Sequence, residues 1–87
     1  MKWSVGYLPS GENDLAAVWM AFPSDRQTIT DAALRIEQEL ERDPESKGED
    51  FYGDRIFQYG PLAVVYVLFD DERTVKITQV MRIRETN

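Results

Sequence analysis

Apolar and polar residues alternate near the start of the chain with the two-residue period of a β-strand. The pattern predicts a strand over residues 2–8, whose large side chains share one face: Trp3, Val5 and Tyr7. Ser4 and Gly6 occupy the other face. We expect Pro9 to end this strand, because proline has no amide hydrogen to donate to a neighbouring strand.

Two stretches with the period of an α-helix come next. In the first, apolar residues recur at i, i+3, i+4 and i+7 and form one stripe: Leu15, Val18, Trp19 and Phe22. Ser10 is a suitable N-cap, and Glu12 and Asp14 lie in the first turn, where the helix dipole favours acids. Pro23 should end this helix, because the residue before a proline avoids helical backbone angles.

The second helical stretch carries a longer apolar stripe: Ile29, Ala32, Ala33, Ile36 and Leu40. Ser24 and Gln27 match a capping box at its start, and Asp43-Pro44 marks its end. The small side chains of Ala32 and Ala33 should allow close approach to the first helix. We therefore expect a helical hairpin that covers a flat apolar surface.

The last third of the chain reads as three short strands joined by two tight turns. It follows a polar loop, residues 45–54, which we expect to be the most mobile region. The first of the three strands starts near Arg55, and Gly60-Pro61 marks the first turn. Residues 62–69 are nearly all apolar, as in a central strand covered on both faces. Three acids and one base, Asp70-Asp71-Glu72-Arg73, form the second turn.

Residues 74–84 form the predicted last strand, whose side chains alternate between two faces. One face carries Val75, Ile77, Met81 and Ile83, and the other carries Lys76, Thr78, Arg82 and Arg84. The alternation breaks at Gln79 and Val80, which predicts a β-bulge there. We expect the bases of this strand to lie together on a sheet face that the helices leave open.

The element order β-α-α-β-β-β predicts a single α+β domain over residues 1–87. Two helices should pack as a hairpin on one face of a small, mainly antiparallel sheet. The other face of the sheet would then be available to a partner.

The composition excludes several kinds of catalytic and metal-binding site. The chain has no cysteine and no histidine, so disulfides, thiolate nucleophiles and thiolate metal sites are excluded. Asp70, Asp71 and Glu72 share one turn but lack the spacing of a calcium loop, so we expect no metal and no cofactor. The N-terminus carries neither a long apolar run nor a secretory signal, which predicts a soluble, cytoplasmic protein without membrane contact.

Charge is distributed unevenly along the chain. The net charge is −6, and the acid-rich residues 37–54 account for all of it. Bases gather on or beside the last strand: Arg73, Lys76, Arg82 and Arg84. Proteins that bind long phosphate backbones are usually basic overall, so the charge disfavours generic nucleic-acid binding.

Three pieces of the sequence together resemble the RelE/ParE superfamily, the toxins of type II toxin–antitoxin systems. The first is an opening strand followed by Pro9, Asp14-Leu15 and Trp19. The second is a helix that ends in Asp43-Pro44, with a loop that leads through Gly53-Asp54-Arg55. The third is a Gly-Pro turn, a Val-Val-Tyr strand, an acidic turn and a Val-x-Ile-x-x-Val strand. The resemblance spans nearly the whole chain.

The resemblance implies a compact toxin that an antitoxin segment wraps and neutralises, with roles in growth inhibition and plasmid stabilisation. Some members cleave messenger RNA in the ribosome, and others poison DNA gyrase. The nucleases carry a cluster of bases on their strands. Arg55, Arg82 and Arg84 match parts of that cluster, whereas Phe57 and Ala63 stand where further bases would be expected.

Three functional hypotheses follow. In the first, the chain binds a macromolecular target, gyrase or the ribosome, through a set of bases: Arg55, Lys76, Arg82 and Arg84. Tyr52 in the polar loop would then contact a partner, such as the cognate antitoxin. In the second, the chain is a ribosome-dependent messenger-RNA endonuclease that uses Arg55, Arg82 and Arg84 around the phosphate. In the third, it is a toxin-derived scaffold that has lost toxicity and only binds a partner chain. Independently of these three, the alternative interpretation of the bases is an ordinary solvated strand face that pairs with nearby acids.

Overall fold

The computed structural model describes residues 2–83. These residues form the following elements in chain order: β1 (Ser4–Tyr7), α1 (Pro9–Ala21), a 3-10 turn (Pro23–Asp25), α2 (Arg26–Arg42), β2 (Glu49–Phe51), β3 (Asp54–Tyr59), β4 (Leu62–Phe69), a second 3-10 turn (Asp70–Glu72) and β5 (Thr74–Arg82).

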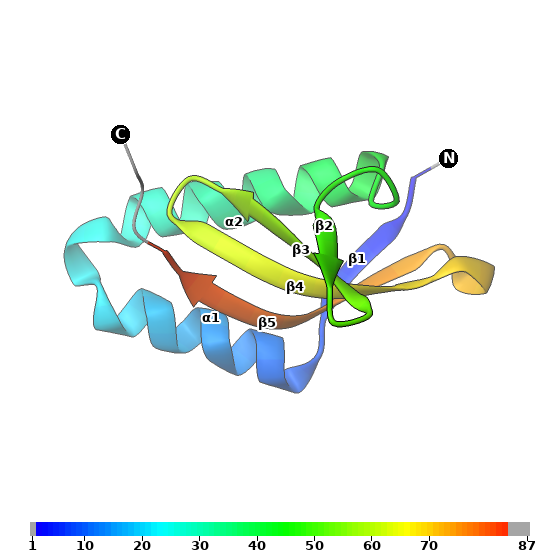
Figure 1. Cartoon of the computed structure of the whole chain (residues 1–87). Coiled ribbons are helices and arrows are strands. Elements are labelled where there is room, and N and C mark those ends of the chain that lie inside the picture. Colours follow the sequence, from blue (N-terminus) through cyan, green and yellow to red (C-terminus); the bar gives the residue numbers. More distant parts are fainter. Residues whose placement is uncertain (1, 84–87) are drawn as a thin grey trace.

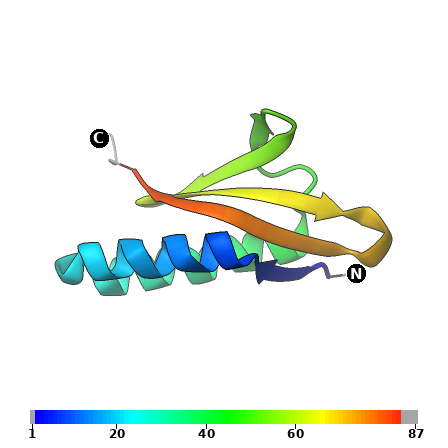
Figure 2. The ribbon, with the colours of Figure 1, turned by 90° about the horizontal axis from the view of Figure 1, so that it is seen from below.

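The strands form one sheet in the order β1-β5-β4-β3-β2. β1 runs parallel to β5, and the other neighbours pair antiparallel. Figure 1 shows both helices running along the sheet, and Figure 2 shows that they lie on the same side of it. On the opposite side, which we call the reverse face, the β2–β3 hairpin curls away from the helices (Figure 2). The predicted α+β architecture is therefore confirmed.

The polar loop predicted over residues 45–54 contains a short strand instead. β2 pairs with β3 through three residue pairs, from Glu49 opposite Ile56 to Phe51 opposite Asp54. Tyr52 and Gly53 form the connecting turn, and both have positive φ angles, 52° and 91°. Two-residue hairpin turns with positive φ match the twist of the strands they join. The sequence did not predict this strand, because the stretch is rich in acids and glycine, which are rare in sheets.

The core lies between the sheet and α2. Its fully buried side chains come mainly from α2, β4 and β5: Ile29, Ile36, Leu40, Leu62, Tyr66, Val75 and Ile77. Residues 62–66 of β4 are all buried, as predicted for a central strand covered on both faces, whereas Phe69 at the end of the strand is exposed. From α1, Leu15 and Val18 pack against this core but remain partly exposed. Only two of the four residues in the predicted apolar stripe of α1 therefore contact the core, because Trp19 and Phe22 are exposed.

Helix α1 is held against β5 rather than against α2. Gly11 makes this approach possible, because a Cβ built on it would lie 2.4 Å from the carbonyl oxygen of Ile77. The Ser10 hydroxyl donates to the Thr78 carbonyl oxygen at 2.8 Å. The Asp14 carboxylate accepts a hydrogen bond from the Val80 amide at 3.1 Å. These contacts fall where β5 is irregular, so α1 supplies partners to backbone groups of that segment.

The β-bulge predicted at Gln79 and Val80 is present one residue earlier. Val65 pairs with Gln79 and Tyr66 pairs with Ile77, which leaves Thr78 as the additional residue of β5. The bulge reverses the alternation of the strand. Val80 is therefore buried on the helix side of the sheet, like Ile77 before the bulge.

The reversal separates the bases of the last strand. Arg82 lies on the helix side, where its Nη2 atom is 2.8 Å from the Asp25 carboxylate. Lys76 precedes the bulge and lies on the reverse face, with its Nζ atom near Gly6. The expectation that Lys76 and Arg82 share one face is therefore wrong. Arg84, the third predicted member, lies outside the described residues.

Two predicted helix caps are also wrong. α1 begins at Pro9 with Leu8 as its N-cap, so Ser10 lies inside the first turn and bonds to Thr78 instead. α2 has Asp25 as its N-cap without a side-chain capping bond, since the 3-10 turn precedes it. Gln27 donates to Asp31 rather than forming a capping box with Ser24. Both helices end, as predicted, shortly before a proline.

Candidate functional site

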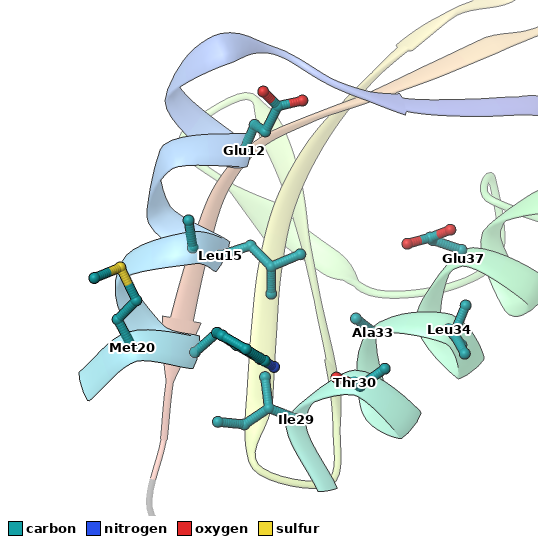
Figure 3. Close-up of a pocket in the computed structure, with 10 residues that line it drawn as sticks. Glu12, Leu15, Met20, Ile29, Thr30, Ala33, Leu34 and Glu37 are labelled. Carbon is teal, nitrogen blue, oxygen red and sulfur yellow. The ribbon is translucent and has the colours of Figure 1, made fainter. Parts of the chain in front are cut away.

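An apolar groove of about 600 Å³ runs between the two helices, and we call it the interhelical groove. Its lining comes from both helices: Glu12, Leu15, Ala16, Trp19 and Met20 from α1, and Ile29, Thr30, Ala33, Leu34 and Glu37 from α2. Leu15, Ile29 and Ala33 point into the space between the helices, while Glu12 and Glu37 stand at one end (Figure 3). The groove is therefore apolar along its length and acidic at that end.

Small residues explain why the groove is present. We expected Ala32 and Ala33 to bring the helices together, but Ala32 is buried in the core and Ala33 lines the groove. Opposite them, α1 contributes another alanine, Ala16. Because α1 is anchored on β5, these short side chains leave the space between the helices unfilled. The helices therefore leave an open groove above the buried Ala33.

Large apolar side chains stay exposed along the groove. Met20 is 69% exposed, Leu34 is 52% exposed and Trp19 is 41% exposed. The Arg26 guanidinium covers one side of the Trp19 ring, 4.0 Å from its centroid, and donates to the Trp19 carbonyl oxygen. Contiguous exposed apolar surface on a small protein usually marks a binding site. The sequence signal for it was the apolar residues outside the helical stripes, Met20 and Leu34.

The acidic end of the groove is fixed by a hydrogen bond to β1. The Tyr7 hydroxyl donates to Glu37 Oε2 at 2.7 Å in a partly buried position. Burial raises the pKa of Tyr7 well above its usual range, and the nearby Glu37 carboxylate raises it further. Tyr7 therefore remains a hydrogen-bond donor at neutral pH and holds the Glu37 side chain at the groove.

Arg55 performs a structural role in the connection between α2 and β2. Its guanidinium donates twice to the Lys47 carbonyl oxygen, at 3.0 and 2.9 Å, and once to the Gly48 carbonyl oxygen, at 3.1 Å. The hydroxyl of Tyr66, its cross-strand neighbour, lies 2.7 Å from the same Lys47 oxygen. Burial raises the pKa of Tyr66, so this hydroxyl also stays protonated. The Arg55 guanidinium is therefore committed to backbone carbonyl groups.

Replacing Arg55 with alanine should lower the free energy of unfolding by about 2 kcal/mol, because partly buried carbonyl groups lose a charged donor. Urea denaturation followed by circular dichroism would measure the loss. Arg42→Ala serves as the control, since Arg42 is well exposed and 3.8 Å from Glu39; its effect should stay below about 0.5 kcal/mol. Equal losses in the two variants would contradict the structural role.

The other predicted site residues are dispersed. The Arg82 guanidinium pairs with Asp25 and covers the Phe22 ring, 4.2 Å from its centroid. Lys76 lies on the reverse face, whereas Arg55 and Arg82 lie on the helix side, so the sheet separates Lys76 from both arginines. Tyr52 stands at the tip of the β2–β3 hairpin, 94% exposed, with its ring edge-to-face against Phe51. The structure does not bring these residues together into one site.

Within residues 2–83, no cluster of three or more acids arranged to hold a metal ion occurs, and neither helix is long and apolar enough to cross a bilayer. The acids of the second 3-10 turn, Asp70–Glu72, are exposed.

Two solved structures are similar to this chain over nearly its whole length. One is a chain of the toxin–antitoxin complex RelBE2 from Mycobacterium tuberculosis, which is 17% identical to this chain and superimposes on it with a TM-score of 0.77. The match covers 98% of this chain and 95% of the RelBE2 chain. The other is a chain of the chromosomal ParDE toxin–antitoxin system of P. aeruginosa, which is 13% identical to this chain and has a TM-score of 0.72. The match covers 94% of this chain and 97% of the ParDE chain. This chain has a RelE/ParE-like fold. No protein-family model and no curated protein sequence matches it.

The RelE/ParE fold therefore accounts for the sequence resemblance described above. The order of elements, the turns and the apolar strands that carried the resemblance belong to the scaffold. The bases that would carry nuclease chemistry are placed differently from the expectation: Arg55 and Arg82 are engaged within the chain. The interhelical groove, in contrast, is an apolar surface left open between two elements of this fold.

Proposed function

We propose that this chain is the toxin component of a type II toxin–antitoxin pair, acts on a macromolecular target in the cytoplasm, and is neutralised by a cognate antitoxin. The observation that supports this most directly is the interhelical groove, an unfilled apolar surface on a fold similar to chains of two toxin–antitoxin assemblies. A groove of this kind accepts the apolar face of an amphipathic helix.

The groove defines the chemistry of the antitoxin segment. Side chains spaced at i, i+3, i+4 and i+7 on a partner helix would contact Leu15, Met20 and Leu34. At the end where Glu12 and Glu37 stand, the same helix should carry lysine or arginine. We therefore expect an antitoxin segment that is apolar in its middle and basic at one end.

The placement of the bases favours a toxin that binds its target over one that cleaves RNA. Phosphate-ester cleavage needs cations that converge on the phosphate, together with an acid and a base. Arg55 donates to the loop carbonyl groups and Arg82 pairs with Asp25, on the far side of the sheet from Lys76. Among the predicted contact residues in the described part of the chain, Tyr52 at the hairpin tip is 94% exposed, and Lys76 lies half-buried on the reverse face.

Inducible expression with and without the adjacent reading frame tests this function. Expression of the chain alone should slow growth while ribosome-bound messages stay intact, and co-expression of a neighbouring antitoxin gene should restore growth. The antitoxin should also co-purify with the chain. Normal growth during expression of folded chain alone would contradict the proposal, and cleaved message in the slowed cells would favour the endonuclease instead.

A further inference from the structure

The reverse face of the sheet carries a hollow of about 430 Å³ near the start of β4 and the end of β5. Its lining is mostly apolar but includes one carboxylate and one amide: Gly48, Glu49, Ile56, Phe57, Gln58, Ala63 and Ile83. The strand register places Glu49, Ile56 and Gln58 on this face together with Ala63. The β2–β3 hairpin, which curls away from the helices, forms one wall (Figure 2).

The polar groups of the hollow are unengaged. Within residues 2–83, neither the Glu49 carboxylate nor the Gln58 amide forms a side-chain hydrogen bond or an ion pair. Other carboxylates nearby in the sequence are occupied: Glu39 is 3.1 Å from Lys47, which lowers the pKa of the Glu39 carboxyl. The hollow therefore presents an available negative charge beside an apolar floor.

Two described bases beside the β2–β3 hairpin, Arg55 and Lys47, are engaged away from this charge. Arg55 donates to Lys47 and Gly48 carbonyl oxygens, and Lys47 pairs with Glu39. The strand register places a further acid of the hairpin, Asp54, on the same face as Glu49. A phosphate would be repelled by this arrangement, whereas a cationic group would be attracted. The long stem of a lysine or arginine can also cover apolar surface while its charged end reaches a carboxylate.

We propose that this hollow binds a lysine- or arginine-bearing segment of a protein, with the apolar part of the segment on Ile56, Ala63 and Ile83 and its positive charge at Glu49. This deepens the proposed function, on which it rests, because it assigns the target of the reverse face to the class of proteins rather than nucleic acids. The exposed Tyr52 on the same hairpin offers a further aromatic contact for a cation or an apolar side chain.

Binding can be tested with defined probes on the purified chain by nuclear magnetic resonance. The probe is an acetylated and amidated pentapeptide, Ala-Leu-Arg-Leu-Ala. The first control is the same peptide with citrulline in place of arginine, and the second is a single-stranded uridine octanucleotide. The arginine peptide should cause saturable shifts at the amides of Glu49, Ile56 and Ala63. The citrulline peptide should bind about fivefold more weakly, since it lacks the charge of the pair.

Glu49→Gln should lower affinity for the arginine peptide by about fivefold and leave the citrulline peptide unaffected. Asp71→Asn, which removes an acid in the distant 3-10 turn, should change neither affinity. The absence of saturable shifts, equal affinity for the two peptides, or preferential binding of the octanucleotide at the same amides would each overturn the inference. None of these results depends on toxicity, so a chain that slows growth but ignores the peptide fails only here. A chain that binds the peptide but leaves growth unchanged fails only the proposed function.

Discussion

Replacing Leu34 with glutamate should weaken binding of the antitoxin by about a hundredfold, while the chain stays folded. Leu34 lines the interhelical groove from α2 and is 52% exposed, so the new charge needs no burial in the free chain. In the complex the carboxylate would be trapped against apolar partner side chains without a compensating donor. It would also add to the negative charge of Glu12 and Glu37 at the end of the groove.

Isothermal titration calorimetry with the co-purified antitoxin would measure this loss. Gln38→Glu is the matched control, because it places the same charge on an exposed position of α2 that does not line the groove. Met20→Glu, on the opposite wall, should reproduce the effect of Leu34→Glu. If Leu34→Glu and Gln38→Glu bind the antitoxin equally well, the interhelical groove is not its binding site. In cells, Leu34→Glu should also remain growth-inhibitory when the antitoxin is present.

Replacing Gly11 with alanine should lower the free energy of unfolding by roughly 2–4 kcal/mol, although alanine is the better helix former. The helix propensity gain is at most about 1 kcal/mol. Against it, the new Cβ would lie 2.4 Å from the Ile77 carbonyl oxygen, so α1 must move away from β5. That movement would stretch the hydrogen bonds from Ser10 to Thr78 and from Val80 to Asp14.

Urea denaturation of Gly11→Ala beside Asn13→Ala separates the two effects. Asn13 is exposed on the same helix, so its replacement tests helix propensity without a contact to β5. Asn13→Ala should be neutral or slightly stabilising. A Gly11→Ala chain as stable as Asn13→Ala would mean that the α1–β5 contact adjusts at little cost, and that α1 is held less tightly than its contacts indicate.

The fold was largely predictable because a helix or strand that buries one face needs apolar residues at a regular spacing, and this spacing can be read in the sequence. Strand β4 has an apolar residue at every position, and the stripe of α2 repeats at helical spacing, so both elements and their buried sides follow from the sequence. Strand β2 was missed since its residues, Glu49 to Phe51, are exposed or half-buried and carry no apolar alternation. Pairing with β3 and the Tyr52-Gly53 turn stabilise it instead.

The candidate sites were less predictable, because they depend on contacts between segments distant in the chain. Asp14 and Val80 meet across 66 residues, and Asp25 and Arg82 meet across 57. No local pattern indicates that Arg55 donates to the Lys47 carbonyl oxygen or that Arg82 pairs beside α2. The predicted basic face was therefore dispersed, and the hollow near Glu49 emerged on a surface expected to be cationic.

The amino-acid sequence by itself determined the number, order and kind of most elements, and the concentration of negative charge between residues 37 and 54. It could do so because hydrophobic periodicity and formal charge are properties of the chain before it folds. The tertiary structure alone decided that α1 rests on β5 and leaves a groove beside α2. It also decided, through the single extra residue Thr78, which face of the sheet receives Arg82. A one-residue shift reverses every later side chain of a strand, and only the pairing of β5 with β4 determines where that shift occurs.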